Sequence, residues 1–260
     1  MERPAGVLLD IDGLLVVSWD PVPGAVDAVA RLRSGGVPVR FVTNTTSRSA
    51  GEIAASLRGV GFDLEDSELL TAGDLTRALL DREFAGADAM VLDEGPGVVP
   101  GSVTVVQGAR RERARVVVVG GAGESFEWSA INSALRALLA GAALVGVHGA
   151  EMWRTDEGAC LDGGAYLRML ASVSGVEPLI VGKPAPAMFE AACASIGIEP
   201  TRAAMVGDDL HSDVLAAQAL GIRGVLVRTG KFHPGVLETA GDVPDQVIDS
   251  VASLPAMLGL

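Results

Sequence analysis

Two aspartates separated by one residue follow directly on a short apolar run near the start of the chain. Asp10 and Asp12 come after Gly6-Val7-Leu8-Leu9 and before Gly13. Side chains two positions apart on a strand point to the same side, so both carboxylates would reach one end of a buried strand. Neighbouring carboxylates repel each other unless a cation or a shared proton relieves them. The pair therefore indicates chemistry, with a plain Asp-Gly turn as the alternative.

The two carboxylates suit different chemical roles. A carboxylate can attack an electrophilic phosphorus or carbon atom and form a covalent intermediate, which makes Asp10 the candidate nucleophile. A second carboxyl group close to the first can protonate the leaving oxygen and later activate water, which makes Asp12 the candidate general acid and base.

A second acidic cluster follows another apolar run late in the chain. Asp208 and Asp209 come after Ala-Ala-Met-Val-Gly at residues 203–207, and Asp213 lies one helical turn further on. Mg²⁺ prefers a few carboxylates together with water and substrate phosphate, and the spacing lacks the glycine and the terminal Glu of an EF-hand calcium loop. Two strands that end in acids predict one shared magnesium site. Asp213 has the alternative role of a helix cap.

Two further segments have residues that suit a phosphoryl group. Thr43 and Asn44 begin a Thr/Asn/Ser-rich stretch after an apolar run. Hydroxyl groups, backbone N–H groups and the start of a following helix can hold phosphate oxygens there, and a helix-capping cluster is the alternative. Lys183 follows residues 179–182, where its ammonium group can neutralise an attacking carboxylate and a phosphate together. A solvated loop lysine is the alternative for this residue.

The elements that must position these residues alternate between short apolar runs and helical patterns. We expect strands at residues 7–10, 37–43, 179–182, 203–207 and 224–228, and helices at 24–35, 49–59, 187–196 and 213–220. This alternation predicts an α/β fold with one doubly wound parallel sheet. Between its halves, residues 90–147 show their own strand and helix series. We therefore expect a core of residues 1–83 and 178–260 with an inserted α/β cap of residues 84–177.

Composition argues against several classes of partner. The 260-residue chain has 20 Lys and Arg against 33 Asp and Glu, a net charge of −13, which disfavours nucleic acid and anionic membranes. The basic run at residues 110–115 is interpreted as a solvated turn. No secretory signal or membrane-spanning apolar stretch is evident, so a cytoplasmic location is expected. Cys160 and Cys193 lack CxxC spacing and are expected to be free thiols.

Four segments together resemble the motifs of the haloacid dehalogenase (HAD) superfamily. They are Asp10-x-Asp12-Gly13, Thr43-Asn44, Lys183-Pro184 and Gly207-Asp208-Asp209-x-x-x-Asp213. The insert between the second and third motifs resembles the α/β cap of the NagD-like (type IIA) branch. Within that branch, Asn44-Thr45-Thr46 is similar to the phospholysine/phosphohistidine/inorganic pyrophosphate phosphatase group.

This resemblance implies a magnesium-dependent phosphatase that hydrolyses a small phosphorylated metabolite through an aspartyl-phosphate on Asp10. It also makes a homodimer formed through the cap plausible. The residues it implies for the Mg²⁺ site are Asp10, Asp12 through its backbone carbonyl, and Asp208, with Asp209 and Asp213 in support. The residues it implies for phosphate positioning are Thr43, Asn44 and Lys183, of which Lys183 also counts as catalytic.

Substrate choice is expected to lie in the cap. In residues 151–156, Trp153 can stack on a ring and Arg154 can pair with an anion, with core packing and a solvated charge as the alternatives. Two other functions stay open. One is a non-catalytic sensor of a phosphorylated metabolite that uses the same pocket. The other is a dinucleotide-dependent oxidoreductase that uses residues 120–123, although Gly-Gly-Ala-Gly lacks the GxGxxG spacing.

Overall fold

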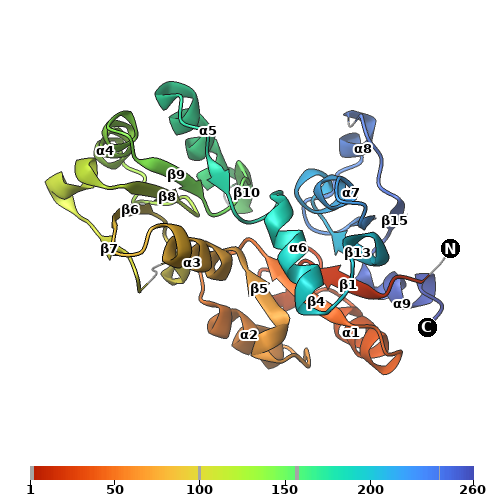
Figure 1. Ribbon diagram of the computed structural model, residues 1–260. Coiled ribbons are helices and arrows are strands. Elements are labelled where there is room, and N and C mark those ends of the chain that lie inside the picture. Colours follow the sequence, from red (N-terminus) through yellow and green to blue (C-terminus); the bar gives the residue numbers. More distant parts are fainter. Residues whose placement is uncertain (1–2, 99–100, 156–157, 240) are drawn as a thin grey trace. The chain divides into compact units, whose positions relative to one another are not determined.

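The computed structural model describes residues 3–98, 101–155, 158–239 and 241–260. Its contacts divide the chain into two compact units, which can be followed by colour in Figure 1. The first unit is formed by Met1–Thr43, Ala50–Leu70 and Pro186–Leu260, and the second by Asn44–Ser49 and Thr71–Ala185. Each unit has its own parallel sheet and its own hydrophobic core.

The first unit contains a six-stranded sheet in the order β15-β14-β13-β1-β4-β5. The strand β1 lies at its centre, where Leu9 is opposite Val206 on one side and Phe41 on the other. The carboxyl ends of parallel strands meet at one edge, so the residues that follow β1, β4, β13 and β14 are neighbours there. The strand bounds are β1 (Gly6–Leu9), β4 (Val39–Thr43), β5 (Leu69–Thr71), β13 (Ala203–Gly207), β14 (Arg223–Val227) and β15 (Gln246–Ile248).

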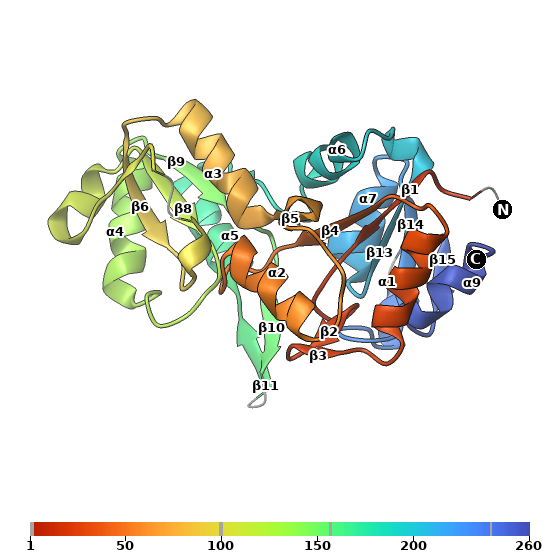
Figure 2. The ribbon, with the colours of Figure 1, turned by 90° about the horizontal axis from the view of Figure 1, so that it is seen from below.

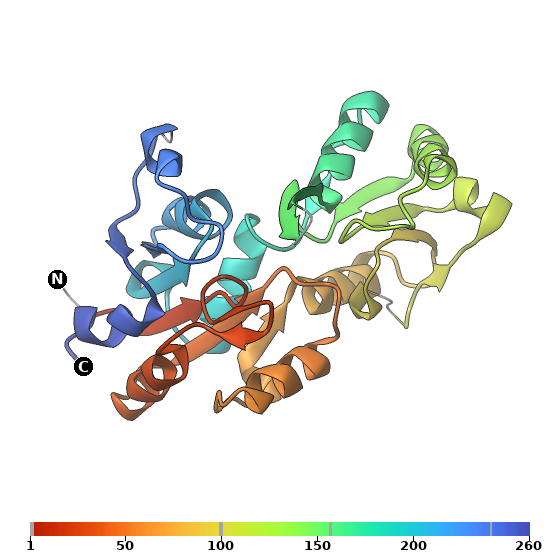
Figure 3. The same ribbon diagram turned by 180° about the vertical axis from the view of Figure 1, so that it is seen from behind.

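Helices cover both faces of this sheet, as the doubly wound prediction required. In β1, Val7 and Leu9 share a core with Val29 of α1 and Ile53 of α2, while Leu8 between them faces the other side. Figures 1 and 2 show α6 and α7 on that opposite face, and Figure 3 shows α9 beside α1. The bounds are α1 (Ala25–Ser34), α2 (Ala50–Gly59), α6 (Pro186–Ser195), α7 (Ala216–Gln218), α8 (Gly235–Thr239) and α9 (Leu254–Met257), with a small hairpin of β2 (Val16–Val17) and β3 (Asp20–Pro21).

The second unit contains a five-stranded parallel sheet in the order β12-β9-β8-β6-β7. Alternation along β8 fills two cores: Val117 and Val119 pack with α4 and α5, and Val116 and Val118 pack with α3. An antiparallel hairpin of β10 and β11 extends from this unit (Figure 2). The bounds are α3 (Ala72–Glu83), β6 (Asp88–Leu92), β7 (Thr104–Val105), β8 (Val116–Val119), α4 (Trp128–Leu139), β9 (Ala143–Gly146), β10 (Met152–Thr155), β11 (Gly158–Leu161), α5 (Gly163–Ser174) and β12 (Leu179–Ile180).

One strand prediction is wrong. Residues 179–182 were expected to continue the first sheet, but β12 pairs with β9 at the edge of the second sheet. The reason is that α5 forms the crossover that a parallel neighbour of β9 requires, which returns the chain to that sheet first. The core and cap boundaries after residues 83 and 177 stay predictions.

None of the helices in the described ranges is long and apolar enough to cross a membrane.

Candidate active site

The two aspartates of the first motif lie at the carboxyl end of β1. The N–H of Asp10 donates to the carbonyl of Val206 at 3.0 Å, which extends the pairing with β13 by one residue and buries the Asp10 side chain. Asp12 is exposed, because the chain turns at Gly13, whose N–H donates to the carbonyl of Val16 at 2.7 Å. The structure therefore places a buried carboxylate and a solvent-accessible one in the same short loop.

Three carboxylates from two distant parts of the sequence meet in the first unit. Asp10, Asp208 and Asp213 are all buried, and each offers an oxygen atom within 4.8 Å of the others. The buried Oδ1 of Asp208 accepts no hydrogen bond from any residue that the structure describes. A set of hard oxygen donors that includes this unsatisfied buried atom fits Mg²⁺, which takes carboxylates and keeps water and phosphate in its remaining positions.

The electrostatic environment of Asp208 also favours a cation in this cluster. Burial raises the pKa of its carboxyl group, the negative charges of Asp10 and Asp213 raise it further, and the backbone N–H of Lys231 acts in the opposite direction. The three buried acids thus repel one another when they are ionised. A divalent cation bound among them would remove this repulsion.

Asp209 and Asp213 have different surroundings, although both belong to the same sequence motif. Oδ1 of Asp209 accepts from the N–H groups of His211 at 3.1 Å and Ser212 at 3.0 Å, so this residue caps the π-helical segment Leu210–Leu215. Asp213 turns inward, and its Oδ2 accepts from the N–H of Asp209 at 3.2 Å. The helix-cap role that was an alternative for Asp213 therefore belongs to Asp209.

The phosphate-binding candidates fall in both units. Thr43 is the last residue of β4 in the first unit, and its side chain is buried. In the second unit, Asn44 and Lys183 form two reciprocal bonds, from Asn44 Nδ2 to the carbonyl of Lys183 and from the N–H of Lys183 to Asn44 Oδ1, each 2.9 Å. Gly182 keeps room for this pair, since a Cβ there would lie 2.6 Å from Asn44 Oδ1. The Asn44 amide thus fixes the backbone that carries the Lys183 ammonium group.

The two cap candidates lie on the hairpin of the second unit. Trp153 in β10 is opposite Cys160 in β11, and 45% of its surface is exposed. The core-packing alternative for Trp153 is therefore wrong. Arg154 belongs to the same strand, but its side chain lies outside the described residues.

Lys231 is a residue at this site for which the sequence analysis proposed no role. Its Nζ lies 3.4 Å from Oδ2 of Asp209, and its backbone N–H donates to Oδ2 of Asp208 at 2.7 Å. Burial alone would lower the pKa of Lys231, but attraction by Asp209, Asp208 and the other nearby carboxylates outweighs it and raises the pKa. The signal in the sequence was the position of Thr229-Gly230-Lys231 just after β14, at the sheet edge that carries the acids.

A separate acidic group organises the loops of the second unit. Asp93 follows β6, and its oxygens accept from the N–H groups of Gly121 at 2.7 Å and Gly95 at 3.2 Å. Burial raises the pKa of Asp93 to about 6, against the opposing effect of these bonds and of the Thr46 hydroxyl. A Cβ at Gly120 would overlap the Asp93 carboxylate. An acid therefore fills the glycine loop in which a dinucleotide phosphate would have to bind.

This burial predicts a pH-dependent stability that Asp93→Asn removes. The folded chain binds a proton at Asp93 that the unfolded chain, with an ordinary pKa of 3.8, does not. Protonation of Asp93 therefore contributes fully to the stability of the fold below pH 3.8, and this contribution is lost as pH rises through about 6. From about pH 7.5 to about pH 5, the wild-type chain should gain about 1 kcal/mol of unfolding free energy relative to Asp93→Asn. Urea unfolding at both pH values measures this, and a difference independent of pH would contradict it.

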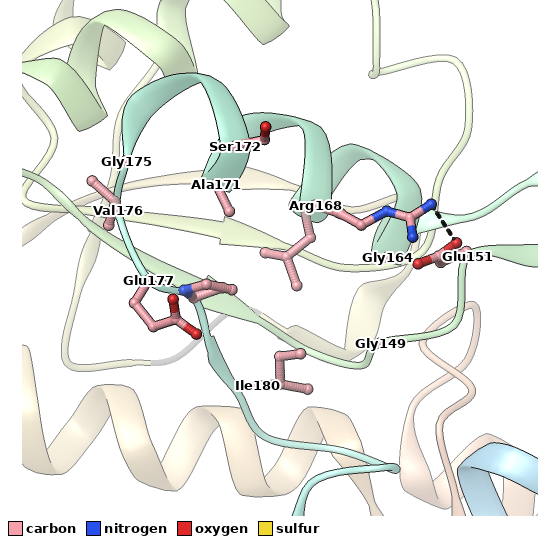
Figure 4. Close-up of a pocket in the computed structure, with 12 residues that line it drawn as sticks. Gly149, Glu151, Gly164, Arg168, Ala171, Ser172, Gly175, Val176, Glu177 and Ile180 are labelled. Atoms are coloured by element: carbon pink, nitrogen blue, oxygen red, sulfur yellow. Dashed lines mark ion pairs between the residues drawn. The ribbon is translucent and has the colours of Figure 1, made fainter. Parts of the chain in front are cut away.

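The second unit also has an open hollow of about 510 Å³ beside α5, drawn in Figure 4. Apolar side chains such as Leu167, Val176 and Ile180 line it, and an ion pair of 2.7 Å between Arg168 and Glu151 lies at one end. Glu151 begins the segment 151–156 in which substrate choice was expected, whereas Asp10, Asp12, Lys183 and Asp208 are not among the residues that line this hollow. The acidic cluster is therefore the better candidate for chemistry.

Comparison with known families supports the same reading of the motifs. Residues 7–124 match the model of a family described as haloacid dehalogenase-like hydrolase, and residues 180–254 match one described as HAD-hydrolase-like. The first match includes Asp10, Asp12, Thr43 and Asn44, and the second includes Lys183, Asp208, Asp209 and Asp213.

Similar proteins cover nearly the whole chain. Haloacid dehalogenase-like hydrolase domain-containing protein 2 of Homo sapiens is 35% identical over 87% of this chain and 85% of its own. Phospholysine phosphohistidine inorganic pyrophosphate phosphatase of Rattus norvegicus is 33% identical over 97% and 93%. Among solved structures, NagD from E. coli K-12 superimposes with a TM-score of 0.82 at 25% identity, covering 96% of this chain and 98% of NagD.

Proposed function

Because this chain belongs to the haloacid dehalogenase-like hydrolases, as a phosphatase of their NagD-like branch, we propose that it hydrolyses a small phosphorylated metabolite in a magnesium-dependent reaction. The observation that carries the proposal is the buried cluster of Asp10, Asp208 and Asp213. The unsatisfied Oδ1 of Asp208 supports a cation in this cluster.

The residues that would hold Mg²⁺ are the carboxylates of Asp10 and Asp208 and the backbone carbonyl of Asp12, with Asp209 and Asp213 in support. When bound, Mg²⁺ supplies positive charge that offsets the repulsion between a carboxylate and an anionic phosphoryl group. Without that charge, a carboxylate nucleophile and a phosphate monoester would repel each other. The raised pKa of Asp208 supports this assignment, since its cause is in part the same crowding of negative charge.

Asp10 and Asp12 divide the chemical work. A carboxylate oxygen of Asp10 attacks the phosphorus atom, the bond from phosphorus to the leaving oxygen breaks, and Asp12 gives its proton to that oxygen. Water then attacks the phosphorus of the aspartyl-phosphate, loses a proton to Asp12, and releases inorganic phosphate with Asp10 restored. The burial of Asp10 and the exposure of Asp12 support these roles, because a nucleophile profits from fixed orientation and a proton carrier from access to solvent.

Thr43, Asn44 and Lys183 are proposed to position the phosphoryl group. Lys183 is 3% exposed, and a buried ammonium group is costly unless it faces negative charge. Its backbone is fixed by Asn44 on both sides, so the ammonium group would start from a defined position. A preorganised cation of this kind stabilises the charge of the transferring phosphoryl group.

Substrate choice is proposed to depend on the hairpin of β10 and β11. The exposed ring of Trp153 can stack on a planar leaving group, and Arg154 is proposed to pair with an anion. The exposed apolar side chains Met152, Trp153 and Leu161 also support a homodimer formed through this unit. A cytoplasmic location remains part of the proposal.

Phosphate release tests the proposed function directly. The substrate panel contains sugar phosphates, nucleotides, pyridoxal phosphate, p-nitrophenyl phosphate, pyrophosphate and phosphorylated lysine and histidine. The last three are chosen because the relative from Rattus norvegicus is named for them. We expect release from at least one monoester with Mg²⁺ and none after chelation by EDTA. Equal release with and without Mg²⁺ would contradict the metal assignment. Binding of a phosphorylated compound without any turnover would favour the sensor.

A further inference from the structure

Two glycines from distant parts of the first unit enclose one oxygen of Asp208. Gly13 has φ +84° and Gly230 has φ +61°, values that side chains other than glycine rarely adopt. A Cβ built on either glycine would overlap Oδ2 of Asp208, and a Cβ on Gly230 would also lie 2.5 Å from Cα of Gly13. Two main-chain segments thus approach this carboxylate as closely as glycine allows.

Hydrogen bonds complete the enclosure. The backbone N–H of Lys231 donates to the same Oδ2 at 2.7 Å. The hydroxyl of Thr229 donates to the carbonyl of Gly13 at 2.5 Å, which joins the loop after β14 to the loop after β1. Since Oδ2 is held in this way, the other oxygen of Asp208, Oδ1, has a fixed direction and is left unsatisfied among the described residues.

The Lys231 side chain has a separate role. Its ammonium group lies near Asp209, whose other oxygen caps the following helical segment, and about half of the side chain is exposed. The contact between Lys231 and Asp208 is made by the main chain and does not depend on the side chain. Substitution at residue 231 can therefore separate the two contributions.

We propose that Thr229-Gly230-Lys231 is a positioning element for the metal centre, which turns Asp208 so that its Oδ1 faces the cation. The proposal rests on the magnesium site of the proposed function. Thr229 keeps the two glycine loops together, Gly230 leaves room for the carboxylate, and the N–H of residue 231 fixes its orientation. Groups that orient a metal ligand in this way set metal affinity.

Substitutions at Thr229 test this element. Thr229→Val keeps the shape but removes the donor to Gly13, and the dissociation constant for Mg²⁺ measured by calorimetry should rise about tenfold. The Mg²⁺ concentration that gives half-maximal phosphate release should rise by the same factor. Thr229→Ser restores the hydroxyl and should restore both values. Lys231→Met should bind Mg²⁺ at least as tightly as the wild type, since it keeps the N–H and removes a positive charge.

Thr76→Val is the matched control, because the Thr76 hydroxyl also donates to a backbone carbonyl, that of Ala72, at 2.7 Å in the second unit. It should lower stability and leave Mg²⁺ affinity unchanged. Wild-type affinity in Thr229→Val, or a weakening in Thr76→Val as large as in Thr229→Val, would overturn the positioning role. No Mg²⁺ binding by the wild-type chain would instead overturn the metal site itself, so the two failures are distinguishable.

Discussion

Asp10→Asn should abolish phosphate release, with kcat at least about a thousandfold below that of the wild-type chain. The amide keeps the size and the buried position of the side chain, but its uncharged carbonyl oxygen is too weak a nucleophile to attack phosphorus and form the aspartyl-phosphate. Initial rates at saturating substrate and Mg²⁺ measure the loss. Phosphate transfer from a labelled substrate to the protein should disappear with it.

The control for this experiment is Asp63→Asn, which removes one negative charge from an exposed position in the same unit. It should keep the wild-type rate and the wild-type labelling. A variant at Asp10 that is folded by circular dichroism and still turns over at the wild-type rate would show that another residue is the nucleophile. Trace activity is to be compared with the fraction of deamidated protein found by mass spectrometry.

Asp208→Asn should lose most of the Mg²⁺ response, with kcat/KM at millimolar Mg²⁺ about a hundredfold lower. In the wild-type chain, Mg²⁺ at ten times its dissociation constant should add about 1.4 kcal/mol to the unfolding free energy. The variant should gain much less at the same concentration. Denaturant titrations with Mg²⁺ and with EDTA measure both.

The EDTA condition gives this second experiment its own internal test. Asp208→Asn removes one of three buried acids whose negative charges repel one another. Without metal, the variant should therefore be at least as stable as the wild type. Loss of the Mg²⁺ response together with intact stability in EDTA would show that Asp208 binds the metal and is not needed for the stability of the fold. A full Mg²⁺ response in the variant would remove Asp208 from the metal site.

The meeting of Asp10 and Asp208 could be predicted because each residue directly follows an apolar run. Asp10 follows β1 and Asp208 follows β13, and the adjacency of these strands follows from the parallel α/β pattern. Asp213 required more than spacing, since the π-helical segment Leu210–Leu215, and not a regular helix, turns its carboxylate toward the other two acids. Nothing in the local sequence distinguishes those two geometries.

Contacts made through the main chain could not be predicted in the same way. The N–H of Lys231 holds Asp208, and the amide of Asn44 holds the backbone at Lys183, so side-chain types at 231 and 183 carry no information about these bonds. The prediction of the sheet to which β12 belongs was wrong for a related reason. The run at β12 is apolar and strand-like in either sheet, and the choice depends on the crossover through α5, which the sequence analysis had not assigned.

The position of β1 between β4 and β13 also sets an order of events during synthesis. One edge of β1 can pair as soon as β4 leaves the ribosome, but the other edge must wait until the whole second unit and α6 have been made. Contacts between residues so far apart in sequence form late, and an apolar strand with an open edge is prone to wrong association in the meantime. Asp208 directly follows β13 in the chain. The three acids can therefore come together only after β13 has been made and can pair with β1. A chain interrupted before Ala203 would expose that edge and would lack the cluster of three acids altogether.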